Sequence, residues 1–471
     1  MPTGLGRKTA IAGIALAMAT PASAQGLSAE EAAALRNEIA TLKAQVERLE
    51  QRLDAAGTPA APVGTAAASP AQVPAPAGGT PVQSASAAPG DGDVAIDWKG
   101  SPRFSEGLRS FKVKGRIQMD AGYVSVPPAI DDKAKGFVNE VRRIRLGGEG
   151  TLGGGFGYKL ETELSDNKVD LVDTYITYEK DRWLVMLGNQ NAFQSLDELI
   201  GDTSGSVMER AAFTDAFGFE RRLGLSVQYR AGMLLAQGGV FSDSVDSLTD
   251  DEDGDENNSY GLDGRLVVAP KVGKAQLHFA GSYHWRRLGT LSETPLRYRQ
   301  RAFLHANNMR FLATPTIDGK EEVHYGLEAA GVMGRLHFAG ETHWLNVARP
   351  GAADPTFFGG YAEVGYFLTK GDSRGYKGGI FTNKAPKRPL GKDGIGSIQV
   401  TLRYDYLDLD DRDIAGGKQN AYIAAIIWSP IEYLRFNANY AHIDYAGAAI
   451  LAGTRSNYGV DVMGLRAELD F

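Results

Sequence analysis

From Phe111 to the last residue, the chain alternates apolar and polar residues in runs of roughly 9–14 residues. The first run shows the pattern on both of its faces. One face carries Phe111, Val113, Ile117, Met119 and Tyr123, and the other carries Lys112, Lys114, Arg116, Gln118 and Asp120. Because side chains of a strand point alternately to opposite sides, this period of two predicts a strand with one apolar and one polar face.

Sixteen such runs follow one another, separated by turn residues. They lie near 111–123, 138–152, 155–165, 170–179, 182–188, 221–231, 233–242, 259–269, 274–287, 322–333, 335–347, 357–369, 396–408, 419–429, 433–445 and 459–471. Short connections mostly alternate with long ones, and an even number of strands with this alternation is typical of bacterial membrane barrels. The pattern predicts an all-β fold, a transmembrane antiparallel β-barrel of about 16 strands, within residues 94–471.

Two features of the run ends favour a membrane barrel. Aromatic residues gather there, which is typical of the girdles at the two lipid–water boundaries and also of ordinary strands; they include Trp183, Trp285, Trp344, Trp428, Tyr404, Tyr406, Tyr440 and Tyr445. The last run continues to the final residue, Phe471, and a terminal strand that ends in Phe resembles the signal by which outer-membrane barrels are recognised for assembly.

The connection between the runs at 182–188 and 221–231 is about 30 residues long, whereas most connections have 4–6 residues. We expect this segment to fold into the barrel and narrow it. The segment 370–393 is also long, although it falls at the end of the barrel where short turns are expected. Either a strand is miscounted or this turn also folds inward.

The first 93 residues differ from the rest of the chain. Residues 1–24 have a basic start at Arg7 and Lys8, a short apolar centre and a small-residue cleavage site, which predicts a secretory signal peptide. Residues 57–93 are Ala-, Pro- and Gly-rich with almost no charge, which predicts an extended linker.

Residues 27–56 carry a heptad pattern of apolar residues. Leu35, Leu42 and Leu49 occupy one seam position, and Ile39, Val46 and Leu53 occupy the other. This spacing predicts an α-helical coiled coil, with a lone amphipathic helix as the alternative. β-Branched residues at one seam position favour two chains, but the pattern does not exclude three.

Composition and charge narrow the classes of function. The chain of 471 residues has no cysteine, so an exported form cannot use disulfides. The net charge is −7, and −9 without the leader, at 48 basic against 57 acidic residues. Eight of the acids lie in 243–256, a tract that fits a solvated loop or one that bridges divalent metal to lipopolysaccharide. This balance argues against nucleic acid as a partner.

Three stretches resemble the phosphate-selective porin O and P family of Gram-negative outer membranes. They are FVNEVRRIRL at 137–146, the segment from GNQNAFQSLDEL at 188–199 through RRLG at 221–224, and YDYLDL at 404–409 with the hairpin 419–445 and the terminal strand. The resemblance covers roughly residues 105–471. It implies a trimeric barrel of sixteen strands, with 189–220, 288–321 and 370–393 folded into the lumen. The predicted coiled coil fits a trimeric assembly, and we expect it in the periplasm.

Selection of anions needs fixed positive charge in a narrow passage, and the guanidinium fork of arginine matches phosphate oxygens. Parity and the expected inward loops give the candidates for the pore and anion path, which are Lys112, Lys114, Arg116, Arg143, Arg145, Lys159, Arg210, Arg221, Arg222, Arg297, Arg299 and Arg301. Further bases are Arg310 in the fifth loop and Lys384, Lys387 and Arg388 in the long turn. Position 191, where the family commonly has Lys, is Asn191 here, and acids outnumber bases in the 189–220 loop.

These features predict a passive diffusion channel for small hydrophilic solutes, with anions, including phosphate and polyphosphate, as the expected cargo. The alternative is a general, non-selective porin that also tethers the outer membrane to the cell wall through its coiled coil. We expect a homotrimer in contact with outer-membrane lipid and lipopolysaccharide, with peptidoglycan as a candidate partner of the coiled coil.

An outer-membrane enzyme is the competing class. A barrel phospholipase would need a Ser two residues after a His, and none of His278, His284, His305, His324, His337, His343 and His442 has one. No nucleophile and base pair stands out, and the sequence predicts neither a cofactor nor a catalytic metal site.

Overall fold

The computed structural model describes residues 94–471 apart from 166, 246–258 and 290–295. The predicted signal peptide (1–24), coiled coil (27–56) and linker (57–93) lie outside the described residues, as does most of the acidic tract. These remain predictions from the sequence.

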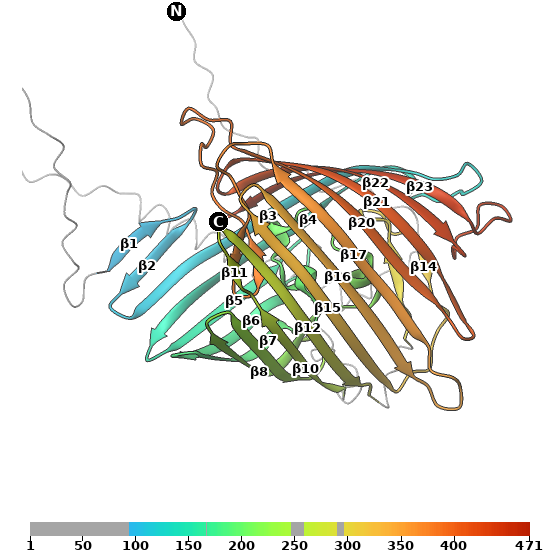
Figure 1. The fold of residues 1–471 in the computed structure, drawn as a ribbon, viewed down its shortest axis with the longest axis horizontal. Coiled ribbons are helices and arrows are strands. Elements are labelled where there is room, and N and C mark those ends of the chain that lie inside the picture. Colours follow the sequence, from blue (N-terminus) through green and yellow to red (C-terminus); the bar gives the residue numbers. More distant parts are fainter. Residues whose placement is uncertain (1–93, 166, 246–258, 290–295) are drawn as a thin grey trace, which may run out of the picture. The chain divides into compact units, whose positions relative to one another are not determined.

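Sixteen antiparallel strands form one closed sheet, as the alternation predicts (Figure 1). The ring closes where the last strand, β23, pairs with the first, β3, from Asp461↔Ser125 to Asp470↔Arg116. In order around the barrel the strands are β3 (Arg109–Ser125), β4 (Gly136–Gly153), β5 (Phe156–Glu163), β6 (Asp170–Lys180), β7 (Trp183–Asn191), β8 (Arg221–Ala231), β9 (Leu234–Phe241), β10 (Tyr260–Val268), β12 (Ala275–Arg287), β15 (Glu321–Met333), β16 (Leu336–Ala348), β17 (Thr356–Phe367), β20 (Ser397–Asp411), β21 (Ile414–Ile431), β22 (Leu434–Ala446) and β23 (Tyr458–Asp470).

Two details of the strands differ from the prediction. A hairpin of β1 (Ala95–Trp98) and β2 (Pro102–Glu106) precedes the barrel and pairs with β3; its short strands lack a clear period. The run predicted to end at 408 continues to Asp411, and β21 begins at Ile414, so only two residues connect them. Arg412 takes a positive φ of 57° in that tight turn.

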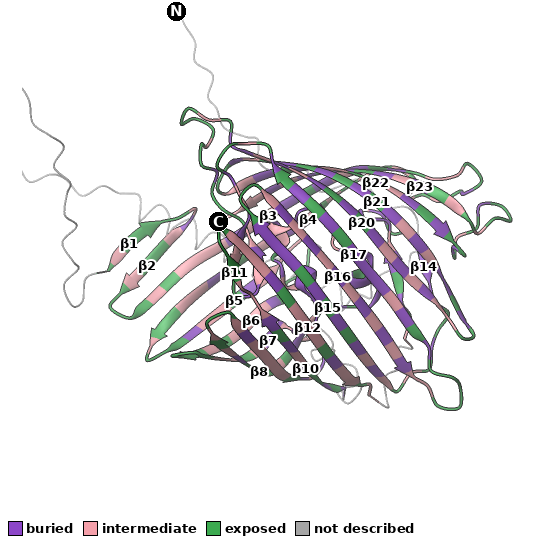
Figure 2. Ribbon diagram, in the orientation of Figure 1, coloured by how far each residue is buried: buried purple, intermediate pink, exposed green. Residues whose placement is uncertain are grey.

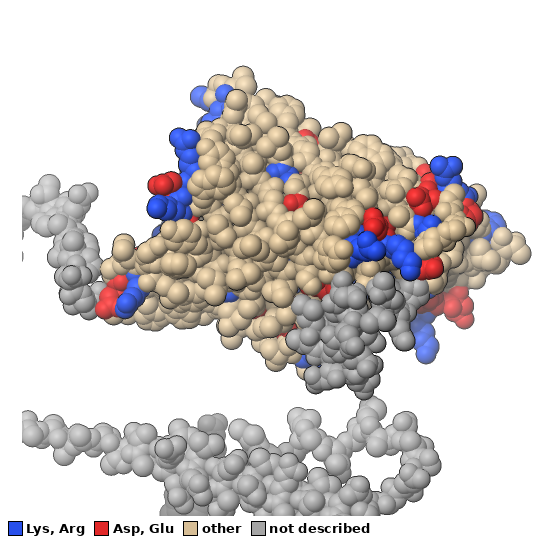
Figure 3. All heavy atoms as spheres, turned by 90° about the horizontal axis from the view of Figure 1, so that it is seen from below, with Lys and Arg blue, Asp and Glu red and all other residues tan. Residues whose placement is uncertain are grey.

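The two faces of each strand meet different surroundings, which Figure 2 shows as alternating burial along the arrows. In β3, Met119 and Tyr123 are each 54% exposed on the outside, whereas Gln118 and Asp120 are at most 4% exposed on the inside. Figure 3 shows a broad, mostly uncharged belt on one outer face, with charged side chains gathered at its two ends. This is the surface expected of a barrel wall that faces lipid. Among the described residues, no helix has the length and apolarity to cross a bilayer.

Three inserted segments fill much of the barrel interior. The constriction loop (192–220) contains α2 (Leu196–Leu199), a 3₁₀ turn, η1 (Asp202–Ser204), and α3 (Ala212–Ala216). The fifth-loop segment (288–320) contains the hairpin of β13 (Arg299–Arg301) and β14 (Arg310–Ala313). The long turn (368–396) contains β18 (Gly375–Lys377) and β19 (Ile380–Thr382). Outside these three segments, the two-residue strand β11 (Lys271–Val272) pairs antiparallel with the start of β12.

The hydrophobic core lies inside the barrel because these three segments bring apolar side chains with them. Phe213 of the constriction loop, Leu304 and Phe311 of the fifth-loop segment and Phe381 of the long turn are each at most 1% exposed. All four belong to one buried cluster that also includes wall residues such as Leu345. The inward folding implied for all three segments therefore matches the structure.

The C-terminal residue closes the barrel at its short-turn end. The Phe471 backbone N–H donates to the Gly115 carbonyl at 2.9 Å, and the Gly115 N–H donates to the Phe471 carbonyl at 3.0 Å. The Phe471 ring lies directly over Gly115, because a Cβ built there would be 2.1 Å from the ring Cζ. Only a residue without a side chain fits beneath this ring.

Replacing Gly115 by valine should therefore destabilise the folded barrel, because the added side chain and the Phe471 ring need the same space. Overpacking of this kind costs about 1–3 kcal/mol. We expect a lower temperature for conversion of the folded to the unfolded band in heat-modifiability gels.

Gly264→Val is the matched control, since Gly264 is also an outward-facing strand glycine. The nearest atom to a Cβ built at Gly264 is 3.9 Å away. Equal conversion temperatures for the two variants would contradict the role given to the Phe471 contact.

Candidate functional site

The barrel interior has one filled side and one side that water reaches. Inward side chains of β15, β16 and β17 are buried along their whole length, as Glu328, Glu341 and Phe357 illustrate at 4%, 2% and 0% exposed. Several inward side chains of β3 to β8 keep partial exposure, although others, such as Gln118 and Asp120, are buried. A basic wall on that side consists of Lys114, Arg116, Arg145, Lys159 and Arg221, with side chains 10–29% exposed.

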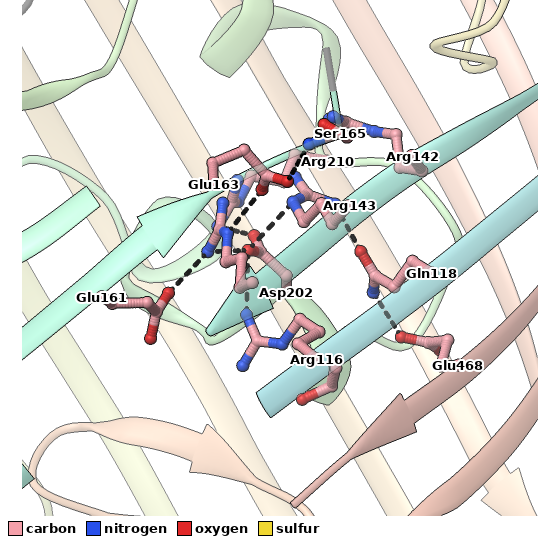
Figure 4. Close-up of polar contacts among 12 residues, drawn as sticks. Arg116, Gln118, Arg142, Arg143, Glu161, Glu163, Ser165, Asp202, Arg210 and Glu468 are labelled. Atoms are coloured by element: carbon pink, nitrogen blue, oxygen red, sulfur yellow. Dashed lines mark hydrogen bonds and ion pairs between the residues drawn. The ribbon is translucent and has the colours of Figure 1, made fainter. Parts of the chain in front are cut away.

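Asp202 of the constriction loop is held by four arginines, the arginine cluster, drawn in part in Figure 4. Its carboxylate lies 3.2 Å from Arg116, 3.2 Å from Arg143, 2.9 Å from Arg145 and 3.0 Å from Arg210. The first three come from β3 and β4, and the fourth comes from the loop itself. The Asp202 side chain is 5% exposed, so this is a nearly dry site in which a carboxylate is bound by several guanidinium groups.

A β-bulge explains how β4 supplies so many of these groups. The β3–β4 register shifts between Gln118 and Met119, so that Gln118 faces Arg143 while Met119 faces Val141. Arg142 is the extra residue. Strict alternation would turn Arg142 toward lipid, but the bulge lets both Arg142 and Arg143 face the lumen, and Arg142 Nε lies 4.0 Å from Glu209 of the constriction loop.

The tip of the constriction loop is also held through its backbone. Arg435 donates to the Gly205 carbonyl at 2.8 Å, Asn383 donates to the Thr203 carbonyl at 2.5 Å, and Arg374 donates to the Ser204 carbonyl. Asn383 and Arg374 belong to the long turn. The long turn thus supports the constriction loop from the short-turn end of the barrel.

Carboxylates of the filled side hold the other half of the loop. Glu341 of β16 accepts hydrogen bonds from the Leu196 N–H at 2.6 Å and the Ser195 hydroxyl at 2.9 Å, at the start of α2. Asp405 of β20 accepts from the Ala212 N–H at 3.1 Å, at the start of α3. Helix N-termini carry unpaired N–H groups that favour negative charge, so acidic residues on this wall position the loop.

The surroundings of two loop carboxyls keep them ionised. Burial by itself raises the pKa of Asp202, but the arginine cluster outweighs burial and holds that pKa well below its usual range. Burial likewise raises the pKa of Glu209, but Arg466 and Arg142 lower it to about 2. Glu198 differs, because burial dominates over nearby Arg210 and raises its pKa. The anchors of the loop therefore stay charged at neutral pH.

The structure brings some of the sequence candidates together and separates others. Arg116, Arg143, Arg145 and Arg210 meet at Asp202, while Lys159 and Arg221 meet at Asp173, at 2.5 and 2.6 Å. Lys112 lies toward the short-turn end, where β3 pairs with β2. Arg222 packs elsewhere, buried near Glu220 and His284.

The bases of the fifth-loop segment lie apart from Asp202. Arg297 donates to the Thr314 carbonyl at 3.1 Å, and the Arg301 side chain lies 4.0 Å from Asp215. Arg299 is exposed at the start of β13. These candidates stand nearer the long-loop end of the passage than the arginine cluster does.

Several lumen-facing arginines were not among the candidates. Three of them are buried inside the barrel. Arg265 pairs with Glu328, and Arg403 pairs with Asp197 and Glu363. Arg466 pairs with Asp120 and Glu209. The same alternation that identified Arg116 would have found them. Within the described ranges, no group of three or more His, Asp or Glu side chains is arranged to hold a metal ion.

Comparison with known proteins agrees with this architecture. The family model described as phosphate-selective porin O and P matches residues 111–471. An uncharacterized protein of Caulobacter vibrioides is 54% identical over 468 residues, which cover 98% of this chain and 94% of that protein. Among solved structures, OmpT of Vibrio cholerae superposes with a TM-score of 0.50 at 9% identity, over 78% of this chain and 99% of OmpT. An anion-selective porin from Comamonas acidovorans gives a TM-score of 0.48 at 13% identity, over 77% of this chain and 100% of that porin.

Asp202→Asn should destabilise the protein by about 3 kcal/mol at neutral pH, because the nearly buried Asp202 carboxylate is the counter-charge that four arginines share. A carboxyl whose pKa is depressed by folding stabilises the folded state above the unfolded pKa, about 3.9 for Asp, and this contribution is lost as pH falls through the folded value. The difference between wild type and variant should therefore be constant from pH 7 to about 4 and shrink below that.

Urea unfolding of the detergent-solubilised protein at several pH values measures this difference. Asp413→Asn is the control, since Asp413 pairs with Arg349 at 2.5 Å but its side chain is 65% exposed. Exposed pairs of this kind contribute little to stability, because solvent screens them. Equal, small losses in both variants would mean that the arginine cluster does not depend on Asp202.

Proposed function

The chain belongs to the phosphate-selective porin O and P family, and from this premise we propose that it is a passive, water-filled channel for small hydrophilic anions, including phosphate and polyphosphate. Membership in this family and the closed barrel make it a porin of the outer membrane. The selectivity for anions is the part that we propose.

The observation that carries this proposal is the one-sided distribution of partly exposed cations. Lys114, Arg116, Arg145, Lys159 and Arg221 occupy the side of the lumen that water reaches. Positive charge on the wall of a narrow passage attracts anions strongly, because low-dielectric surroundings weaken screening. Arginine also suits phosphate, since its planar fork can donate two hydrogen bonds to one oxyanion.

The acidic partners of these cations favour rapid passage over tight capture. Arg145 already contacts Glu161 and Glu163 as well as Asp202, and Lys159 contacts Glu161 and Asp173. An anion that enters must compete with these carboxylates for the same donors. Conduction requires binding that is weak enough for release, so this pairing supports a channel that passes phosphate without holding it.

We further propose a homotrimer whose neighbours are outer-membrane lipid and lipopolysaccharide. An apolar hollow on the outside of β3 and β20–β23, floored by Ala121, Ala424 and Ala438, supports contact with another copy there. The predicted coiled coil at 27–56 would join three chains in the periplasm and reach toward peptidoglycan.

A variant that lacks residues 27–93 tests the assembly and the tether together. We expect its trimer to dissociate more readily in detergent, which light scattering measures as a lower molar mass. We also expect less of it to co-sediment with isolated peptidoglycan. Full retention of both properties would remove the role given to these residues.

Reversal potentials in planar bilayers under a salt gradient test the channel proposal. We expect an anion-preferring potential and a current that falls only modestly when phosphate replaces chloride. A cation-preferring potential would defeat the anion proposal and leave the alternative of a general porin.

Lys159→Gln should reduce the anion preference about twofold in the same recordings, because one cation of the passage is lost while Asp173 and Glu161 stay. Lys418→Gln is the control. Lys418 pairs with Asp408 at 2.8 Å on the outer face of the barrel, so its loss should leave the potential unchanged. Equal shifts in both variants would mean that the basic wall does not set selectivity.

A further inference from the structure

A separate cavity lies between the constriction loop and the fifth-loop segment. Its volume is about 160 Å³, and α3 and the β13–β14 hairpin contribute most of its lining. Water reaches it, because Arg210, Arg301 and Asp215 at its edge have side chains 24–37% exposed. It belongs to neither the arginine cluster nor the basic wall, apart from sharing Arg210.

The lining combines an aromatic surface with cations. Phe219 and Phe303 are 9% and 8% exposed, and Leu304 lies beside them. Arg301 and Gln300 follow one another along β13 on the same cavity. An apolar cavity of roughly 150 Å³ is large enough for a benzene ring, so a single aromatic ring fits the space available here.

The acids of the lining already have partners. Arg210 and His305 also pair with carboxylates, so Arg301 is the cation of the lining that can offer a donor to a solute. Asp215 accepts from Arg310 at 3.0 Å and from the Arg301 backbone N–H at 2.8 Å. Glu209 lies 2.5 Å from Arg466. In contrast, Arg301 Nε and Gln300 Oε1 are buried and have no hydrogen-bond partner among the described residues.

The backbone at Phe303 supports a role beyond packing. Phe303 has a φ of 51°, and its N–H donates to the Arg301 carbonyl at 3.0 Å. A bulky residue rarely adopts this left-handed conformation, and such strain persists where the surrounding structure holds it. The tip of the hairpin is held in this way, because Asn307 donates to the Ala134 carbonyl at 2.7 Å and His305 lies 2.9 Å from Glu140.

We propose that this cavity is a binding step for small carboxylates that carry an aromatic ring. The ring would pack against Phe219 and Phe303, and the carboxylate would accept hydrogen bonds from Arg301. Aromatic rings prefer offset or edge-to-face contacts, and arginine binds carboxylates through charge-assisted hydrogen bonds. This inference rests on the proposed anion channel and assigns it a class of organic solute.

Single-channel recording of the full-length protein with benzoate and with acetate tests the inference. Both probes carry one carboxylate, and only benzoate carries a ring. We expect benzoate to interrupt the chloride current at concentrations about tenfold lower than acetate does. Equal effects of the two probes on an anion-selective channel would overturn this inference and leave the channel proposal intact.

Two variants of the lining locate the site. Phe303→Gly removes the ring while glycine adopts the positive φ freely, so the hairpin should keep its backbone. Arg301→Gln removes the charge. Each should weaken the benzoate block about tenfold, compared with the block of the wild type at the same chloride concentration.

Arg297→Gln is the control, because it removes the same charge from the same segment at a residue outside the cavity lining. Its benzoate block should match that of the wild type. Unchanged benzoate block in both Phe303→Gly and Arg301→Gln would overturn the site. A cation-selective wild-type channel would overturn the anion channel and this inference with it.

Discussion

The structure depends on one constraint, which is that backbone polar groups in the hydrocarbon of a membrane must be paired within the protein. A sheet meets this requirement only when it has no free edge. Here the last strand pairs with the first, and the two hydrogen bonds between Phe471 and Gly115 complete the ring at the C-terminus. Apolar side chains then face outward and polar side chains face inward along each strand. Because the ring is closed, the charged residues on the polar faces of the strands all lie in the same lumen.

Charged groups crowded into a narrow interior need partners, and the constriction loop supplies many of them. Asp202 neutralises part of the charge of four arginines, Glu209 lies against Arg466, and Asp197 lies 3.1 Å from Arg403. Removing one partner of a buried ion pair leaves the other charge uncompensated, which costs several kcal/mol. The same contacts thus hold the loop in place and set the charge that a solute meets.

The loop is held differently on its two sides, and this asymmetry shapes the passage. Carboxylates of β16 and β20 bind the starts of its two short helices, whereas arginines of β3 and β4 bind its acidic tip. Phe213, Phe217 and Phe219 of the loop pack toward the filled side, where Phe213 stacks on His343 at 4.7 Å between ring centroids. Water is left to the side lined by β3 to β8. A passage with cations on one wall follows from the way in which the loop is anchored.

The sequence by itself determined the sixteen strands and which residues of each face the lumen, because alternation is a local property of neighbouring residues. It also indicated that the 189–220 segment folds inward, through its length and family resemblance. It did not give the bulge that turns Arg142 inward, the two short helices of the constriction loop, or the pairing of Arg116 with Asp202 and Asp470, residues 86 and 354 positions away. Only the tertiary structure decided these features. Each depends on which side chains meet across the lumen once the ring has closed, and no period along the chain encodes such distant contacts.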